Sequence, residues 1–117
     1  MANKSQNKNT LYAAALFFVL IAVSFMGCSK SSSPGTNEVW MQNIAFTPST
    51  ITVSAHSTVK WTNKDGVAHT VTSSNGMFTS SGNINSGSTY SVQFNTAGTY
   101  PYSCTIHPGM NGVVIVQ

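Results

Sequence analysis

Residues 37–117 consist of short segments rich in valine, isoleucine, threonine and aromatic residues, separated by clusters of glycine, asparagine, serine and proline. Several segments alternate between polar and apolar residues, as from Thr89 to Phe94. A period of two places successive side chains on opposite faces of a strand. The region has no convincing helical period, and short strands at this spacing are typical of β-sandwiches and small barrels. The pattern therefore predicts an all-β domain of about seven strands.

Residues that favour turns separate the expected strands. Asn63–Gly66 and Thr96–Gly98 end in glycine and contain other residues common in tight turns. The stretch Ser73–Ser88 is rich in serine, asparagine and glycine, and it predicts a loop with little regular structure. The seven expected strands are Glu38–Asn43, Thr50–Ser54, Thr58–Thr62, His69–Ser73, Thr89–Phe94, Gly98–Cys104 and Gly112–Gln117.

The N-terminal segment differs from the rest of the chain in composition. Lys4 and Lys8 precede the run Leu11–Met26, in which every residue except Ser24 is apolar when tyrosine is counted as apolar. A run of 16 residues is short for a membrane span, which needs about 20. A basic start followed by an apolar run is typical of a secretory signal. We therefore expect the domain to be exported.

The apolar run ends at Gly27-Cys28, and a small residue before a cysteine at this point resembles the bacterial lipoprotein signal. In that family the cysteine is lipidated and becomes the first residue of the mature chain. The resemblance implies a signal peptide at residues 1–27, a lipidated Cys28 with a flexible tether at 28–36, and a domain at 37–117 that faces the periplasm. Ser29 after the cysteine favours the outer membrane over the inner one. The alternatives are an uncleaved anchor and an ordinary secretory signal.

Charged residues are scarce, at 6% of the chain compared with about 25% in an ordinary soluble protein. After the expected cleavage, three lysines and two acids leave a net charge of +1. A nucleic-acid-binding protein needs a dense footprint of lysine and arginine, so we predict no nucleic-acid partner. The two acids, Glu38 and Asp65, give no firm basis for paired-carboxylate catalysis.

Cys104, His107 and Met110 follow one another at intervals of three residues between two expected strands, and His69 lies 35 residues before the cysteine. A lipid on Cys28 would leave Cys104 without a disulfide partner, and a metal is then one candidate for its sulfur. Two imidazoles and a thiolate with a weak methionine contact suit a copper electron-transfer site. Nitrogen and sulfur ligands disfavour calcium and magnesium, which prefer oxygen.

These residues resemble the cupredoxins, the family of type 1 blue copper proteins, and in particular its amicyanin-like and plastocyanin-like members. The spacing Cys-x-x-His-x-x-Met is the short form of the family's ligand loop. Three further segments carry the resemblance: Phe46–Pro48, Val59–Asn63 and Gly98–Tyr100. The resemblance implies a Greek-key β-sandwich or barrel of seven or eight strands and one copper ion that alternates between copper(I) and copper(II).

The resemblance also implies roles for individual residues. His69, Cys104 and His107 would be the equatorial ligands of copper, and Met110 the axial ligand. Thr70 stands where these members usually carry an asparagine that ties the two ligand loops together. Because threonine has less reach, we expect a looser ligand loop.

The function predicted from the sequence is single-electron transfer between redox protein partners in the bacterial cell envelope, by a monomer that is not an enzyme. The alternative is a copper-binding module that stores, delivers or senses the metal without redox turnover. A cysteine enzyme built on Cys104 and His107 is disfavoured, because no acid or amide stands out as the group that would orient the histidine.

Overall fold

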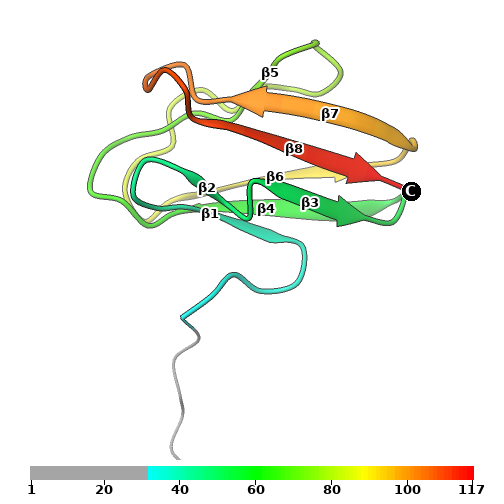
Figure 1. The fold of residues 1–117 in the computed structure, drawn as a ribbon, viewed down its shortest axis with the longest axis horizontal. Helices are drawn as coiled ribbons and strands as arrows, with labels where there is room; N and C mark the ends of the chain where they lie inside the picture. Colours follow the sequence, from blue (N-terminus) through cyan, green and yellow to red (C-terminus); the bar gives the residue numbers. More distant parts are fainter. Residues whose placement is uncertain (1–31) are drawn as a thin grey trace, which may run out of the picture. The chain divides into compact units, whose positions relative to one another are not determined.

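Eight strands form two four-stranded sheets within residues 32–117, the part of the chain that this computed structural model describes (Figure 1). One sheet has the strand order β2-β1-β4-β6, and the other has the order β3-β8-β7-β5. The all-β prediction is therefore confirmed. The strands are β1 (Glu38–Met41), β2 (Phe46–Thr47), β3 (Thr50–Val53), β4 (Ser57–Asn63), β5 (Thr72–Ser73), β6 (Thr89–Phe94), β7 (Gly98–Ser103) and β8 (Asn111–Val116).

Each sheet mixes parallel and antiparallel pairs. β4 runs parallel to β1 and antiparallel to β6, while β8 runs parallel to β3 and antiparallel to β7. Figure 1 shows the two layers, with β7 and β8 in one and β1, β4 and β6 in the other. β4 and β7 both end at the left end of this view. The connections that follow them, residues 64–71 and 104–110, therefore meet at one end of the sandwich.

Aromatic side chains from both sheets fill the core. Trp61 of β4 is fully buried, and its ring contacts the ring of Tyr102 of β7 edge-on, with centroids 5.3 Å apart. Phe78, from the loop after β5, stacks on Trp61 at 6.3 Å. Gly112 of β8 lies beside Tyr102, where an added Cβ would collide with the phenol ring. The strands that lead into and out of the Cys104 loop are thus packed against the centre of the core.

The expected strand His69–Ser73 is wrong in its first three residues, since β5 covers only Thr72–Ser73. His69 instead forms an isolated bridge with Ile84, in which each residue donates its N–H to the carbonyl of the other, at 3.1 and 2.7 Å. Val71 donates its N–H to the Ser81 hydroxyl at 2.9 Å. The loop after β5 therefore supplies hydrogen-bond partners for the backbone of His69 and Val71, which a neighbouring strand would otherwise provide.

Smaller differences have local causes. The sequence analysis missed β2, because two residues are too few to show alternation. β1 ends at Met41 rather than at Asn43, because Asn43 and Ile44 both have a φ of 56° and form the turn into β2. The predicted signal peptide and the predicted lipid site Cys28 lie outside the described residues. No helix in residues 32–117 is long and apolar enough to span a membrane.

Candidate metal centre

The candidate site combines one residue that follows β4 with others that follow β7, so that it joins the ends of the two sheets. His69 lies in the connection between β4 and β5, 35 residues before Cys104. Cys104 comes directly after the last residue of β7, and His107 lies in the loop that leads to β8. Tyr102 and Cys104 are both buried, as alternation along an extended strand requires. β7 therefore directs the Cys104 sulfur into the molecule.

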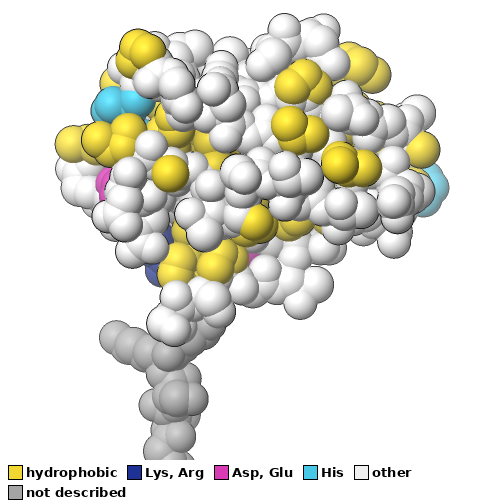
Figure 2. Space-filling view, viewed as in Figure 1, with side chains coloured by type: hydrophobic (Ala, Val, Ile, Leu, Met, Phe, Trp, Pro, Cys, Tyr) yellow, Lys and Arg dark blue, Asp and Glu magenta, His cyan; other side chains and the backbone are white. Residues whose placement is uncertain are grey.

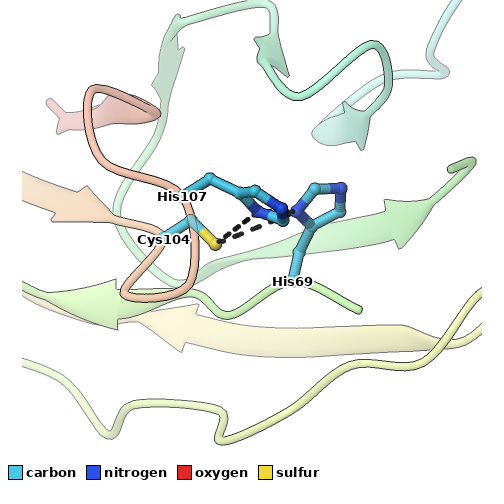
Figure 3. A group of neighbouring side chains, drawn as sticks. All are labelled: His69, Cys104 and His107. Carbon is cyan, nitrogen blue, oxygen red and sulfur yellow. Dashed lines mark hydrogen bonds between the residues drawn. The ribbon is translucent and has the colours of Figure 1, made fainter. Parts of the chain in front are cut away.

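Three potential ligand atoms converge at this end of the sandwich. The Nδ1 atoms of His69 and His107 lie 3.1 Å apart, and the Cys104 sulfur lies 3.8 Å and 3.6 Å from them, respectively. All three atoms lie within 4.8 Å of one another. Figure 3 shows the three side chains pointing toward a common point. The structure thus brings together three of the four residues that the sequence analysis proposed as copper ligands.

The loop between β7 and β8 folds back so that Met110, the fourth proposed ligand, is hydrogen-bonded to Cys104. Cys104 donates its backbone N–H to the Met110 carbonyl at 2.9 Å, and Met110 donates its N–H to the His107 carbonyl at 3.3 Å. Met110 is only 3% exposed, so its side chain packs inside the protein. These hydrogen bonds close a compact loop between β7 and β8.

The environment of the Cys104 sulfur favours the thiolate. The Thr70 N–H donates a hydrogen bond to the sulfur at 3.4 Å. Burial raises the pKa of the Cys104 thiol, but hydrogen bonds from the Thr70 N–H and then from His107 outweigh this and lower the pKa from its ordinary value of 9.0 to about 6. Because the thiolate is the form that binds metals, the protein holds this ligand ready at neutral pH.

Thr70 connects the two ligand loops through its hydroxyl group. Its hydroxyl oxygen accepts the Thr105 backbone N–H at 2.9 Å and lies 3.1 Å from the Thr105 hydroxyl. The Thr72 hydroxyl lies 2.9 Å from the same oxygen. The two loops approach each other closely enough for a threonine to span the gap that an asparagine usually spans.

The sequence analysis missed Asp65 as a part of this site. Its carboxylate oxygen Oδ2 lies 2.7 Å from His69 Nε2, on the side of the ring opposite to Nδ1. The backbone N–H groups of Asn43 and Ile44 also donate to this carboxylate, at 2.7 and 3.0 Å. The one signal in the sequence is the spacing of four residues between Asp65 and His69, and such spacing is common by chance.

Hydrogen bonding determines the charge state of this carboxylate. Burial raises the pKa of Asp65, but hydrogen bonds from Ile44, His69 and Asn43 outweigh it, so the pKa lies below its ordinary value of 3.8. Asp65 is therefore ionised at neutral pH. The buried Asn63 supports its position, because the Asp65 N–H donates to the Asn63 side-chain oxygen at 2.9 Å.

His107 forms the accessible edge of the site. It is half-buried, whereas His69 is fully buried. The exposed hydrophobic side chains of the domain include Ile106 next to it, Ile44, whose N–H donates to Asp65, and Val67, two residues after Asp65. Figure 2 shows a histidine surface among hydrophobic side chains at the left end of the molecule. Access to the site is therefore through an apolar surface.

The donor set fits copper. Two imidazole nitrogens and a thiolate sulfur are the ligands of trigonal copper electron-transfer sites, and the three atoms lie close enough together to bind one ion. Each histidine presents Nδ1 toward the sulfur. Calcium and magnesium, which require oxygen ligands, do not fit this group.

Comparison with known proteins gives a consistent result. The cupredoxin-like domain family matches residues 13–116. Amicyanin-alpha of Methylorubrum extorquens is 33% identical over 101 residues, which are 83% of this chain and 85% of that protein. Plastocyanin of Scenedesmus fuscus is 35% identical over 86 residues, which are 63% of this chain and 88% of that protein. Amicyanin and plastocyanin are electron-transfer proteins rather than enzymes.

Solved structures share the fold. A purple cupredoxin from Nitrosopumilus maritimus superposes with a TM-score of 0.62 at 27% identity, covering 68% of this chain and 98% of that one. The copper(I) form of an amicyanin variant superposes with a TM-score of 0.65 at 28% identity, covering 74% and 94% of the two chains. Homologues of this kind bind one copper ion, and the corresponding ligand group here is His69, Cys104 and His107.

Proposed function

The chain belongs to the cupredoxin family, and on this premise we propose that it carries single electrons between redox protein partners in the bacterial cell envelope. The observation that carries the proposal is the convergence of two imidazole nitrogens and one cysteine sulfur within 4.8 Å at one end of the sandwich. Bound there, copper supplies a reversible one-electron couple between its cuprous and cupric states. His69, Cys104 and His107 would hold the ion, and Met110 would be a fourth, weaker ligand.

The chain's part in the reaction is to keep its ligands in one arrangement. His69 is enclosed and held through Nε2, and Cys104 extends from a strand whose side chains pack in the core. The bond between Thr70 and Thr105 joins the two ligand loops. Side chains held in this way move little when the charge of the site changes. A small reorganisation favours fast outer-sphere electron transfer.

The half-buried edge of His107 is the proposed route for the electron. It is the ligand nearest to solvent, since His69 and Cys104 are buried. The apolar residues around it, Ile106 and Pro108, give a partner a surface from which water is readily displaced. A partner docked there would lie within a short distance of the site without entering the protein.

We propose that a lipid on Cys28 anchors the domain to a membrane. Amicyanin and plastocyanin homologues are periplasmic or lumenal, which supports export. A lipid on Cys28 would leave only residues 29–36 between the anchor and the monomeric domain, so the domain would work close to its membrane, the outer one in our proposal. Cys28→Ala should abolish incorporation of labelled fatty acid, with Cys104→Ala as the matched control. Equal labelling of the Cys28→Ala variant and the parent would contradict the anchor.

The visible spectrum of the full-length protein with copper(II) tests the function. We expect one equivalent of copper to give an intense blue colour from charge transfer between the Cys104 sulfur and the metal. Cys104→Ser should remove the colour, whereas Ser103→Ala, one residue earlier, should retain it. A colourless copper(II) complex of the parent would contradict the electron-transfer function. Rapid loss of copper to a weak chelator would favour copper storage or delivery instead.

A further inference from the structure

The Asp65 side chain connects the buried His69 to the turn at Asn43 and Ile44, more than 20 residues earlier in the chain. Its Oδ2 atom lies 2.7 Å from His69 Nε2, and its two oxygens accept the N–H groups of Asn43 and Ile44, at 2.7 and 3.0 Å. These donors lie 22 and 21 residues before the aspartate. The carboxylate is therefore fixed by the backbone of one segment while it contacts a ligand candidate in another.

These contacts define the protonation of the His69 ring. An ionised carboxylate can only accept hydrogen bonds, so His69 Nε2 carries the proton that lies between the two groups. The Nδ1 atom of a neutral ring then has a free lone pair. That atom faces the Cys104 sulfur and His107 Nδ1, at 3.8 and 3.1 Å. Asp65 thereby selects the tautomer and the ring orientation that a metal ligand needs.

The turn that holds Asp65 has an unusual backbone. Asn43 and Ile44 both have a φ of 56°, a region that costs free energy for residues other than glycine and is rare for a β-branched residue such as isoleucine. In this conformation both of their N–H groups donate to the same carboxylate. The turn therefore directs two adjacent N–H groups at one carboxylate and fixes the position of the Asp65 side chain.

We infer that Asp65 is a positioning residue that fixes His69 through Nε2 and, by its negative charge, stabilises copper(II) relative to copper(I) in this protein. A carboxylate bonded to the far nitrogen of a ligating histidine raises the basicity of the ligand, and loss of such a partner typically lowers metal affinity by about 10–100-fold. The more highly charged copper(II) gains more from a basic ligand. The inference rests on the proposed copper function.

The test replaces the charge but keeps the shape. Asp65→Asn in the full-length protein should raise the copper reduction potential. A tenfold weakening of copper(II) binding relative to copper(I) corresponds to about 59 mV for one electron. Glu38→Gln is the matched control, because Glu38 is the other acidic residue of the chain and is bonded to Thr62 and Lys60 rather than to the site. Its potential should stay near that of the parent.

The colour of the parent and the reduction potentials of the two variants distinguish a failure of the proposed function from a failure of the role of Asp65. A parent without the blue colour defeats the proposed function itself. If the parent is blue and Asp65→Asn and Glu38→Gln shift the reduction potential equally, the proposed function stands but the role of Asp65 is overturned. A general loss of negative charge would then explain both shifts.

A second measurement needs neither copper nor a variant. Nitrogen-15 NMR of the metal-free parent should show His69 protonated at Nε2 and unprotonated at Nδ1. This result would support the inference even if Asp65→Asn failed to fold. Protonation of His69 at Nδ1 with a bare Nε2 would overturn it, because Asp65 would then not select the tautomer.

Discussion

Thr105 donates its backbone N–H to the Thr70 hydroxyl oxygen over 2.9 Å, and this bond joins the segment after His69 to the segment after Cys104. Thr70 also donates its own N–H to the Cys104 sulfur at 3.4 Å. One residue therefore contacts both the metal-binding sulfur and the loop that carries His107. The geometry of the site depends on this residue as well as on the ligands.

Replacement of Thr70 by valine should destabilise the metal-free protein. Valine keeps the shape but removes the acceptor of the part-buried hydrogen bond from the Thr105 N–H, and a typical hydrogen bond contributes about 0.5–1.5 kcal/mol to stability. Denaturant unfolding monitored by fluorescence measures the loss. Thr99→Val is the matched control, since Thr99 is an exposed residue of β7. Equal stability of Thr70→Val and the control would show that the bond between the loops contributes nothing.

The thiol of Cys104 should titrate near pH 6 in the metal-free protein. Burial raises its pKa, but the hydrogen bonds from the Thr70 N–H and then from His107 dominate and lower the pKa to about 6. Ultraviolet absorbance of the thiolate across the pH range measures this value, and Cys104→Ser supplies the baseline. A midpoint close to the ordinary value of 9.0 would contradict the thiolate environment described above.

The same pKa shift predicts how stability depends on pH. Between about pH 6 and pH 9 the unfolded chain binds a proton at Cys104 that the folded protein does not bind, so the free energy of unfolding should rise with pH. The limiting slope for one group is about 1.4 kcal/mol per pH unit. The contribution is complete above pH 9 and is lost as the pH falls through 6. The metal-free Cys104→Ser protein should lack this slope.

Met110→Leu should keep the blue colour and raise the reduction potential. Leucine has a similar volume, so the fold should lose less than about 1.5 kcal/mol, while the loss of an axial donor disfavours copper(II) more than copper(I). Met41→Leu is the matched control, because Met41 is a fully buried methionine of β1. Film voltammetry gives both potentials. Identical shifts in the two variants would exclude Met110 as a ligand.

Electron transfer to small charged reagents should depend weakly on ionic strength. The described charges are few and are largely paired locally: Lys60 lies 3.5 Å from Glu38, and Lys64 lies over the Trp40 ring at 4.5 Å. Long-range steering requires a larger charged surface. Stopped-flow oxidation by an anionic iron complex measures the rate. A fall of more than about tenfold between low and physiological salt would indicate a charged surface near His107.

Features with local signatures were predictable from the sequence. Alternation within the segments located β4, β6, β7 and β8 to within about a residue of their observed ends, and the spacing of Cys104, His107 and Met110 indicated a metal loop before any fold was known. His69 was inferred from its residue type and the family resemblance, although the strand expected around it did not form. Residues only a few positions apart in the chain stay close together in any fold, so a motif of this kind can be recognised before the fold is known.

The contacts that the sequence did not reveal join segments far apart in the chain. Asp65 meets Asn43 and Ile44 across more than 20 residues, and Thr70 meets Thr105 across 35. Whether a threonine can replace an asparagine depends on the distance between two loops, which is a property of the folded sheets. The length of the Thr70 side chain alone therefore could not show that its hydroxyl reaches Thr105.

The ligand group straddles the two sheets, since His69 follows β4 and Cys104 follows β7. An ion held by both would act as a cross-link that closes a segment of 35 residues. No such group exists in the unfolded chain, so the free energy of metal binding becomes resistance to unfolding. A domain with few charges thus gains resistance to unfolding in proportion to how tightly it holds its metal.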